Sequence, residues 1–104
     1  MPEERTTPKD GKRIALVWYR RDQWELLRTR AADPANIEAT YDEWLALAEK
    51  TLRELRAAGV DIVRMDCSVP LMLEWCKQQG LAFDSAARSQ YGAEQLERQS
   101  LIMS

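Results

Sequence analysis

Residues 13–19, Arg-Ile-Ala-Leu-Val-Trp-Tyr, contain the longest apolar run of the chain and decide its fold. An almost unbroken apolar run between charges is typical of a strand in a parallel sheet with helices on both faces. Residues 60–67 form a second, more polar strand, with Asp61, Arg64 and Asp66. We therefore expect the first strand to be covered on both faces and the second to be the exposed edge.

The clearest helix lies between these two strands. Thr40 and Glu43 form a capping box, and apolar residues then recur every three or four positions from Tyr41 to Ala58. Gly59 is expected to end this helix in the left-handed conformation.

Three further helices are expected from weaker signals. Asp22, with Glu25 three residues later, approximates a capping box for a helix over about residues 23–32. Ser68 and Asp84 predict the N-caps of two later helices, the first of which ends at Gly80.

The predicted fold class is therefore α/β, in the order β-α-α-β-α-α, with two short strands packed by about four helices. A connection through two helices predicts parallel strands joined by a right-handed crossover. Residues 12–104 are expected to form one domain after a flexible tail over 1–11, and the last ten residues either continue the final helix or fray. Because most sheets have more than two strands, we expect dimerisation to extend this one.

Composition excludes several classes of function. The 104 residues are 45% hydrophobic and 31% charged with a net charge of −2, which is a globular balance without a strong field for nucleic acid or membranes. Absence of histidine removes the commonest general base and, with only two cysteines, any usual zinc site. The N-terminal residues lack the apolar stretch of a signal peptide, so a cytoplasmic location and reduced thiols are expected. We expect no metal and no cofactor.

Four short stretches resemble a group of small uncharacterised bacterial proteins. They are the Trp-Tyr-Arg strand end (18–20), Glu-Trp-Leu-x-x-Ala-Glu (43–49), Trp-Cys-x-x-x-Gly (75–80) and Asp-x-x-Ala-Arg (84–88). The similarity covers about residues 13–92 and implies a bacterial source and a compact domain, but no activity.

The strand ends are the place where a ligand is expected. Ligands of parallel sheets bind beyond the carboxyl ends of the strands, which here bring together Arg20, Arg21, Asp66, Cys67 and Ser68. The two arginines predict a site for a phosphate or carboxylate, and the alternative is that they are solvated charges at a strand end. A helix start after Cys67 would lower the pKa of its thiol, whereas most free cysteines are buried apolar residues. We identify no catalytic residue.

Tryptophans supply the other candidate residues. Trp24, Trp44 and Trp75 lie on predicted apolar helix faces, where core packing is the ordinary role, but tryptophan is also enriched at interfaces. The leading hypothesis is an interaction module that associates with itself. The alternatives are a small-ligand-binding protein or enzyme acting at the strand ends, and an antitoxin-like or regulatory partner of another protein. Enzymatic activity stays open, although the missing histidine argues against it.

Overall fold

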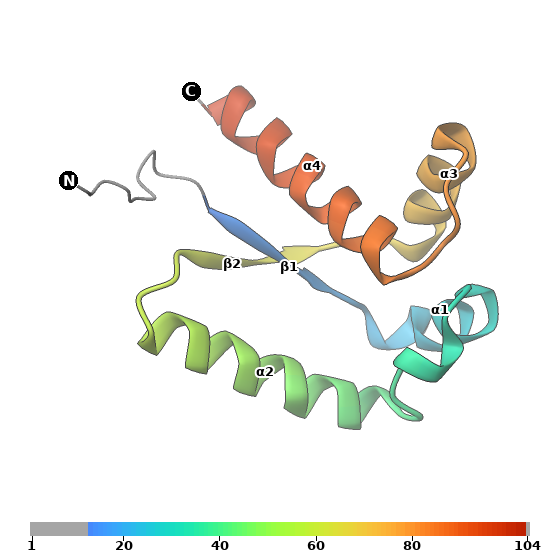
Figure 1. The fold of residues 1–104 in the computed structure, drawn as a ribbon, viewed down its shortest axis with the longest axis horizontal. Coiled ribbons are helices and arrows are strands. Elements are labelled where there is room, and N and C mark those ends of the chain that lie inside the picture. The colour runs from blue at the N-terminus through green and yellow to red at the C-terminus, as the bar shows by residue number, and fades with distance from the viewer. Residues whose placement is uncertain (1–12, 104) are drawn as a thin grey trace.

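A computed structural model describes residues 13–103 and confirms the expected α/β order (Figure 1). The elements are β1 (Ile14–Trp18), α1 (Trp24–Arg30), α2 (Tyr41–Ala57), β2 (Ile62–Asp66), α3 (Val69–Gln79) and α4 (Ser85–Met103), with short 3₁₀ turns at Arg21–Gln23 and Pro34–Asn36. The expected N-terminal tail over 1–11 lies outside the described residues. Residues 95–103 continue α4, so the chain does not leave its helix there.

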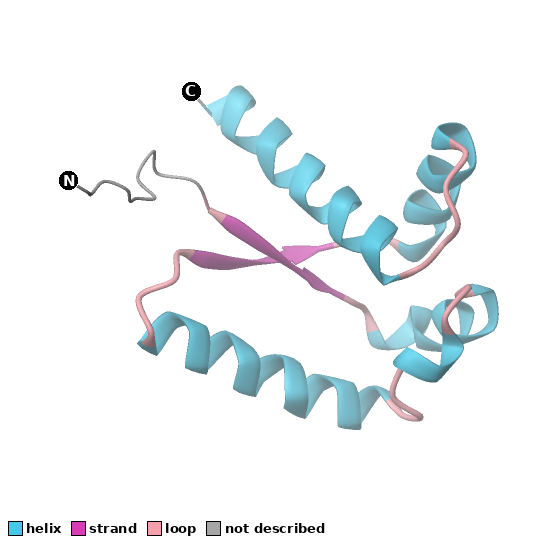
Figure 2. Cartoon of the chain, in the orientation of Figure 1, coloured by secondary structure: helices cyan, strands magenta, loops and turns pink. Residues whose placement is uncertain are grey.

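The sheet is parallel and, within the described residues, has two strands (Figure 2). Ile14 pairs with Ile62 and Trp18 with Asp66 at the two ends of the ladder. Helices α4 and α2 lie on opposite faces of this sheet (Figure 1). The result is a three-layer arrangement with a very narrow middle layer.

Helix termini follow the local sequence signals closely. The side chains of Thr40, Ser68 and Asp84 each accept a hydrogen bond from the backbone N–H three residues further on, at 3.1, 3.4 and 2.9 Å. Gly59 and Gly80 have φ values of 90° and 70°. This left-handed conformation commonly ends a helix, and glycine adopts it without strain because it has no β-carbon. These predicted boundaries are confirmed.

The cap expected at Asp22 is wrong. Asp22 lies inside the 3₁₀ turn, and α1 begins two residues later with Gln23 as its N-cap and no side-chain cap bond. The Gln23 side chain instead accepts a hydrogen bond from the Val69 N–H at 2.9 Å, at the start of α3. The Gln23 side chain therefore caps α3 rather than α1, and a contact between residues so far apart in sequence cannot be found from local spacing.

The expected difference in burial between the two strands is also corrected. Within β1 only Trp18 is buried, and Ile14 is 54% exposed. In β2, Ile62 and Met65 are buried at 4% and 5% exposure. Because the described residues supply two strands, each strand has one edge without a strand partner among them, and the apolar residues in the middle of β1 are only half-buried.

Two apolar clusters hold the layers together. The larger one joins the α4 face of the sheet to α1, α3 and α4, and includes the fully buried Leu27, Val69 and Met72. The smaller one joins the opposite face to α2 around Trp18, Ala48, Leu52 and Ile62. The two clusters meet around a pocket whose lining includes members of both.

Candidate functional site

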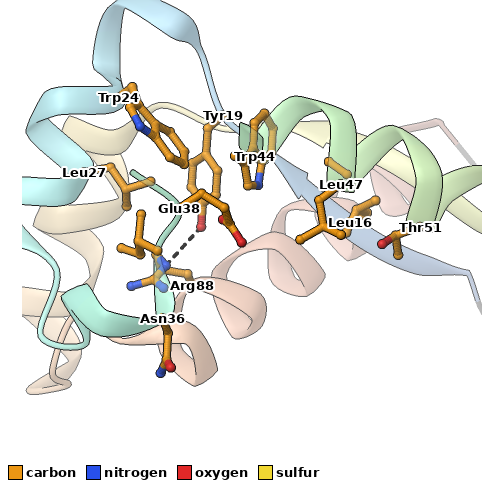
Figure 3. Close-up of a pocket in the computed structure, with 12 residues that line it drawn as sticks. Leu16, Tyr19, Trp24, Leu27, Asn36, Glu38, Trp44, Leu47, Thr51 and Arg88 are labelled. Atoms are coloured by element: carbon orange, nitrogen blue, oxygen red, sulfur yellow. Dashed lines mark hydrogen bonds between the residues drawn. The ribbon is translucent and has the colours of Figure 1, made fainter. Parts of the chain in front are cut away.

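A pocket of about 240 Å³ lies at the carboxyl end of β1, between α2 and the segment that contains α1 and the following turn (Figure 3). Leu16 and Tyr19 come from β1 and the residue just beyond it, and α2 supplies Trp44, Leu47, Ala48 and Thr51. The remaining lining residues come from α1 (Trp24, Leu27), from the 34–40 connection (Asn36, Ile37, Glu38) and from α4 (Arg88). Segments distant in sequence thus form one concave site.

One wall of the pocket is aromatic. The ring centroids of Tyr19 and Trp44 are 5.3 Å apart, those of Trp24 and Trp44 5.6 Å, and those of Tyr19 and Trp24 6.1 Å. These distances are those of rings in direct contact. The three side chains therefore form a continuous aromatic wall rather than a cage with space between its rings.

Arg88 supports the floor of the pocket from α4. It is only 5% exposed, and its guanidinium binds the Asp33 carboxylate through Nη1 and Nη2 at 2.9 and 3.3 Å. It also donates to the Phe83 carbonyl at 3.1 Å and, through Nε, to the Tyr19 hydroxyl at 3.0 Å (Figure 3). Four of the five guanidinium N–H groups are thereby used, which leaves one on Nη2.

This ion pair and its neighbour have well-defined protonation states. Hydrogen bonding from Arg88 lowers the pKa of Asp33 below its ordinary 3.8, although burial opposes the shift. Burial raises the pKa of Tyr19 above 10.0, against the opposing effect of Arg88. At neutral pH Asp33 is therefore charged and Tyr19 is a neutral phenol. Since the Tyr19 oxygen accepts from Arg88 and its O–H has no acceptor among the described residues, that proton can be donated to a ligand.

Glu38 is the charged group of the pocket for which the described residues supply no counter-ion. Its side chain is half-buried and lines the cavity together with Tyr19 and Trp44 (Figure 3). Within residues 13–103, no hydrogen bond or ion pair joins its carboxylate to another group. Thr51 and Asn36 add a hydroxyl and an amide to the same lining.

None of the strand-end residues singled out from the sequence lines this pocket. Arg20 and Asp66 are exposed, and Ser68 is the N-cap of α3. Arg21 forms an ion pair with Asp42 at 2.8 Å and lies over the Tyr41 ring. The site for a phosphate or carboxylate at these residues stays a hypothesis, with Arg21 and Ser68 already engaged in contacts within the protein.

Cys67 does not have the lowered pKa that its position before a helix suggested. It is 2% exposed, and burial, with a smaller contribution from the Asp66 charge, raises the pKa of its thiol to about 11. Its Sγ lies 3.2 Å from the Met65 carbonyl oxygen. Desolvation of the thiolate outweighs the nearby Arg20 charge, which alone would lower this pKa.

The three candidate interface tryptophans are packed inside the molecule. Trp75 is 8% exposed, and the centroid of its ring lies 5.5 Å from that of Tyr91. Its Nε1–H donates a hydrogen bond to Glu94 Oε1 at 3.0 Å. Trp24 is 4% exposed, and its Nε1 has no hydrogen-bond partner among the described residues. Trp44 is half-buried in the aromatic wall. None of these three side chains offers a largely exposed aromatic anchor.

Sequence reasoning missed Glu38, Asp33 and Arg88. Asp33 lies just beyond the helix expected over about residues 23–32, and Arg88 entered only through the Asp-x-x-Ala-Arg stretch over 84–88. One signal was available, because Arg88 follows Ala87 on the apolar face that Phe83 and Tyr91 define. A charged residue on such a face requires a buried partner.

Residues 13–103 hold no group of three or more side chains suited to bind a metal ion. No helix in this range has the length and apolar character needed to cross a membrane. Comparison of the chain with protein-family models, with curated proteins and with solved structures found no match.

Proposed function

We propose that this domain binds a small molecule in the pocket at the carboxyl end of β1. The observation that carries the proposal is the combination of an aromatic wall with polar groups that have no partner among the described residues. Ligand pockets are mostly apolar, with a few placed polar groups that orient the ligand. Here these groups are the Tyr19 O–H, the Glu38 carboxylate and the remaining Arg88 N–H.

The position of the pocket supports the same proposal. It lies where ligands of parallel α/β sheets generally bind, beyond the carboxyl end of a strand. The rigid supports of its floor, the Arg88–Asp33 pair and the Tyr19 contact, would hold the site ready before a ligand arrives. The proposal is binding alone, and we assign no reaction to the site.

Single-ring probes test this proposal by NMR, read from the indole N–H signals of the tryptophans. We expect 2-phenylethanol, phenethylammonium or phenylacetate to shift the signals of Trp24 and Trp44, which line the pocket. The signal of Trp75, which lies outside it, is the internal control. Thr51→Leu, which places a larger side chain in the lining, should abolish the shifts. If none of the three probes shifts the Trp24 and Trp44 signals, the proposed function is wrong.

A second candidate function is self-association through the open edge of β1. Since the Ile14 N–H binds the Asp61 carbonyl and the Cys67 N–H binds the Trp18 carbonyl, the backbone groups of Ala15 and Val17 point away from β2. No charged side chain protects that stretch of edge.

The edge of β2 differs from that of β1. Arg56 occupies its Ile62 carbonyl at 3.3 Å, and the exposed Arg64 and Asp66 add charges to the strand. Charges of this kind discourage strand pairing. A second copy pairing β1 with β1 in antiparallel fashion would create a four-stranded sheet.

Light scattering at high micromolar concentration tests this second candidate. We expect a dimer mass for the unmodified protein and a monomer mass for Ala15→Pro, because proline removes a donor only from the open edge. A monomer mass for the unmodified protein would contradict self-association but would not affect the proposal that the pocket binds a ligand.

A further inference from the structure

We propose that the ligand of this pocket is a small organic cation, an ammonium group on an apolar body, with Glu38 as its counter-ion. This inference rests on the proposed function and adds the chemical class of the ligand. It follows from the charge of the pocket, from its aromatic wall and from its size.

The charges of the pocket leave one negative group uncompensated. Arg88 is held by Asp33 in a two-point ion pair, with side chains only 6% and 16% exposed, so these two charges cancel locally. Glu38 lines the same pocket without a cationic partner among the described residues. A half-buried carboxylate favours a cation close to it more strongly than a solvated one does.

The aromatic wall favours the same charge. The faces of tryptophan and tyrosine rings carry negative electrostatic potential and attract ammonium groups within about 6 Å of the ring centroid. Tyr19, Trp24 and Trp44 all line the cavity, as does Glu38 (Figure 3). Because the rings contact one another, the cation would lie against the wall, with the carboxylate as its second contact.

An anion would fit the same surroundings poorly. It would meet the Glu38 charge and the negative ring faces, and would find one Arg88 N–H and the Tyr19 O–H as donors. The guanidinium charge that would attract it is already neutralised by Asp33. These two donors suit a neutral oxygen of the ligand, such as a hydroxyl, better than a carboxylate.

The cavity limits the size of the ligand. A protein cavity of about 150 Å³ holds one benzene molecule. The pocket of about 240 Å³ is therefore large enough for a single ring with a short side chain. Aliphatic residues, among them Leu16, Leu27 and Ile37, provide contacts for the apolar body.

Matched probes on the intact protein test the charge preference directly. Phenethylammonium, 2-phenylethanol and phenylacetate share the ring and differ mainly in charge. Titrations followed by the Trp24 and Trp44 indole signals should give a Kd for phenethylammonium about tenfold below that for 2-phenylethanol. Phenylacetate should bind most weakly.

Two variants identify the group responsible. Glu38→Gln keeps the side-chain shape and should reduce the preference for phenethylammonium to less than about twofold, while 2-phenylethanol binds as before. Glu49→Gln changes the net charge equally at an exposed position of α2 and should leave the preference intact. The affinities of the unmodified protein test the inference even if Glu38→Gln fails to fold.

The outcomes separate this inference from the proposed function. Equal affinities for phenethylammonium and 2-phenylethanol, or tightest binding of phenylacetate, would overturn the inference that the ligand is a cation. Either result would still agree with ligand binding in the pocket. A preference that persists in Glu38→Gln overturns Glu38 as the counter-ion. Absence of any binding overturns the proposed function and the inference together.

Discussion

The two faces of the sheet differ in how tightly the helices pack against them. On the α4 face, Gly92 lies so close to β1 that a β-carbon added there would lie 2.7 Å from Val17 Cγ2. On the α2 face, the lining of α2 from Trp44 to Thr51 borders a cavity of about 240 Å³. The narrow sheet thus separates a closed layer from an open one.

The difference suggests a division of roles between the layers. The α4 face belongs to the large cluster, which includes the fully buried Leu27, Val69 and Met72. The α2 face has four buried residues in its own cluster, and Trp44, which packs against both clusters, lines the pocket together with Tyr19 and Trp24 of the large cluster. The larger number of buried side chains in the large cluster predicts that most of the apolar stabilisation comes from it, whereas the pocket lies where the two clusters meet.

The largest effect is expected at Arg88, which joins the two layers. Arg88→Met leaves the Asp33 carboxylate without its partner in a mostly buried position, and should lower the free energy of unfolding by about 3 to 5 kcal/mol. Urea denaturation at pH 7 measures the loss. As control, Lys50→Met breaks an exposed pair with Glu54 and should cost less than about 0.5 kcal/mol.

The same pair makes stability depend on pH. The pKa of Asp33 is lowered in the folded state, so its contribution is full above the ordinary value of 3.8 and is lost as pH falls through the lower folded value. The stability difference between the unmodified protein and Arg88→Met should therefore shrink in acid. A constant difference from pH 7 to below pH 3 would contradict the role of this pair.

A smaller loss is expected from adding a methyl group to the closed face. Gly92→Ala gains about 1 kcal/mol of helix propensity, but the clash with Val17 costs about 1 to 3 kcal/mol, so a net loss near 1 kcal/mol is expected. In a Val17→Ala background the clash is removed, and the same substitution should stabilise. Thermal unfolding of the four proteins of this cycle gives the coupling, and additive effects would show that the face is not closed.

On the α2 face, a larger side chain should increase stability rather than lower it. Thr51→Leu places apolar atoms at the pocket and improves helix propensity, so a gain of about 0.5 to 1 kcal/mol is expected. Thr51→Val, similar in size and propensity to threonine, is the matched control and should change stability little. A loss of stability in Thr51→Leu would contradict the difference between the two faces.

The smallest effect is expected at Cys67, where the native protein should barely react. Its burial and its pKa of about 11 keep the thiol protonated and inaccessible at pH 8. Iodoacetamide labelling followed by mass spectrometry should therefore be slow and should accelerate on unfolding. Fast labelling of Cys67 at native conditions would show that the closed layer opens readily.

Sequence alone predicted those features that depend on neighbouring residues. The caps at Thr40, Ser68 and Asp84 each join groups three positions apart, so spacing was sufficient to find them. The parallel strands followed from the long connection, because a short one cannot join them. Failure began where a distant residue intervened, as at Gln23, whose side chain binds a donor of α3.

The candidate site could not be predicted in the same way. Arg88 lies 55 residues from Asp33 and 69 from Tyr19, and no spacing rule connects them. Sequence predicted a ligand site beyond the strand ends and nominated Arg20 and Arg21, whereas the pocket near the end of β1 is lined by other residues. The pocket depends on how α1 and α2 fold back on β1, and this is set by packing rather than by local pattern.

The pairing of β1 with β2 has a consequence for the time course of folding. Ile14 pairs with Ile62, which is synthesised 48 residues later. The β1 segment therefore leaves the ribosome well before its partner strand has been made. Helices such as α2 can form within a microsecond of emerging, whereas closing so long a loop is slow. During synthesis the Ile14–Trp18 segment is therefore an unpaired, aggregation-prone strand, and nascent chains stalled before residue 62 should depend on chaperones far more than those that have passed residue 88.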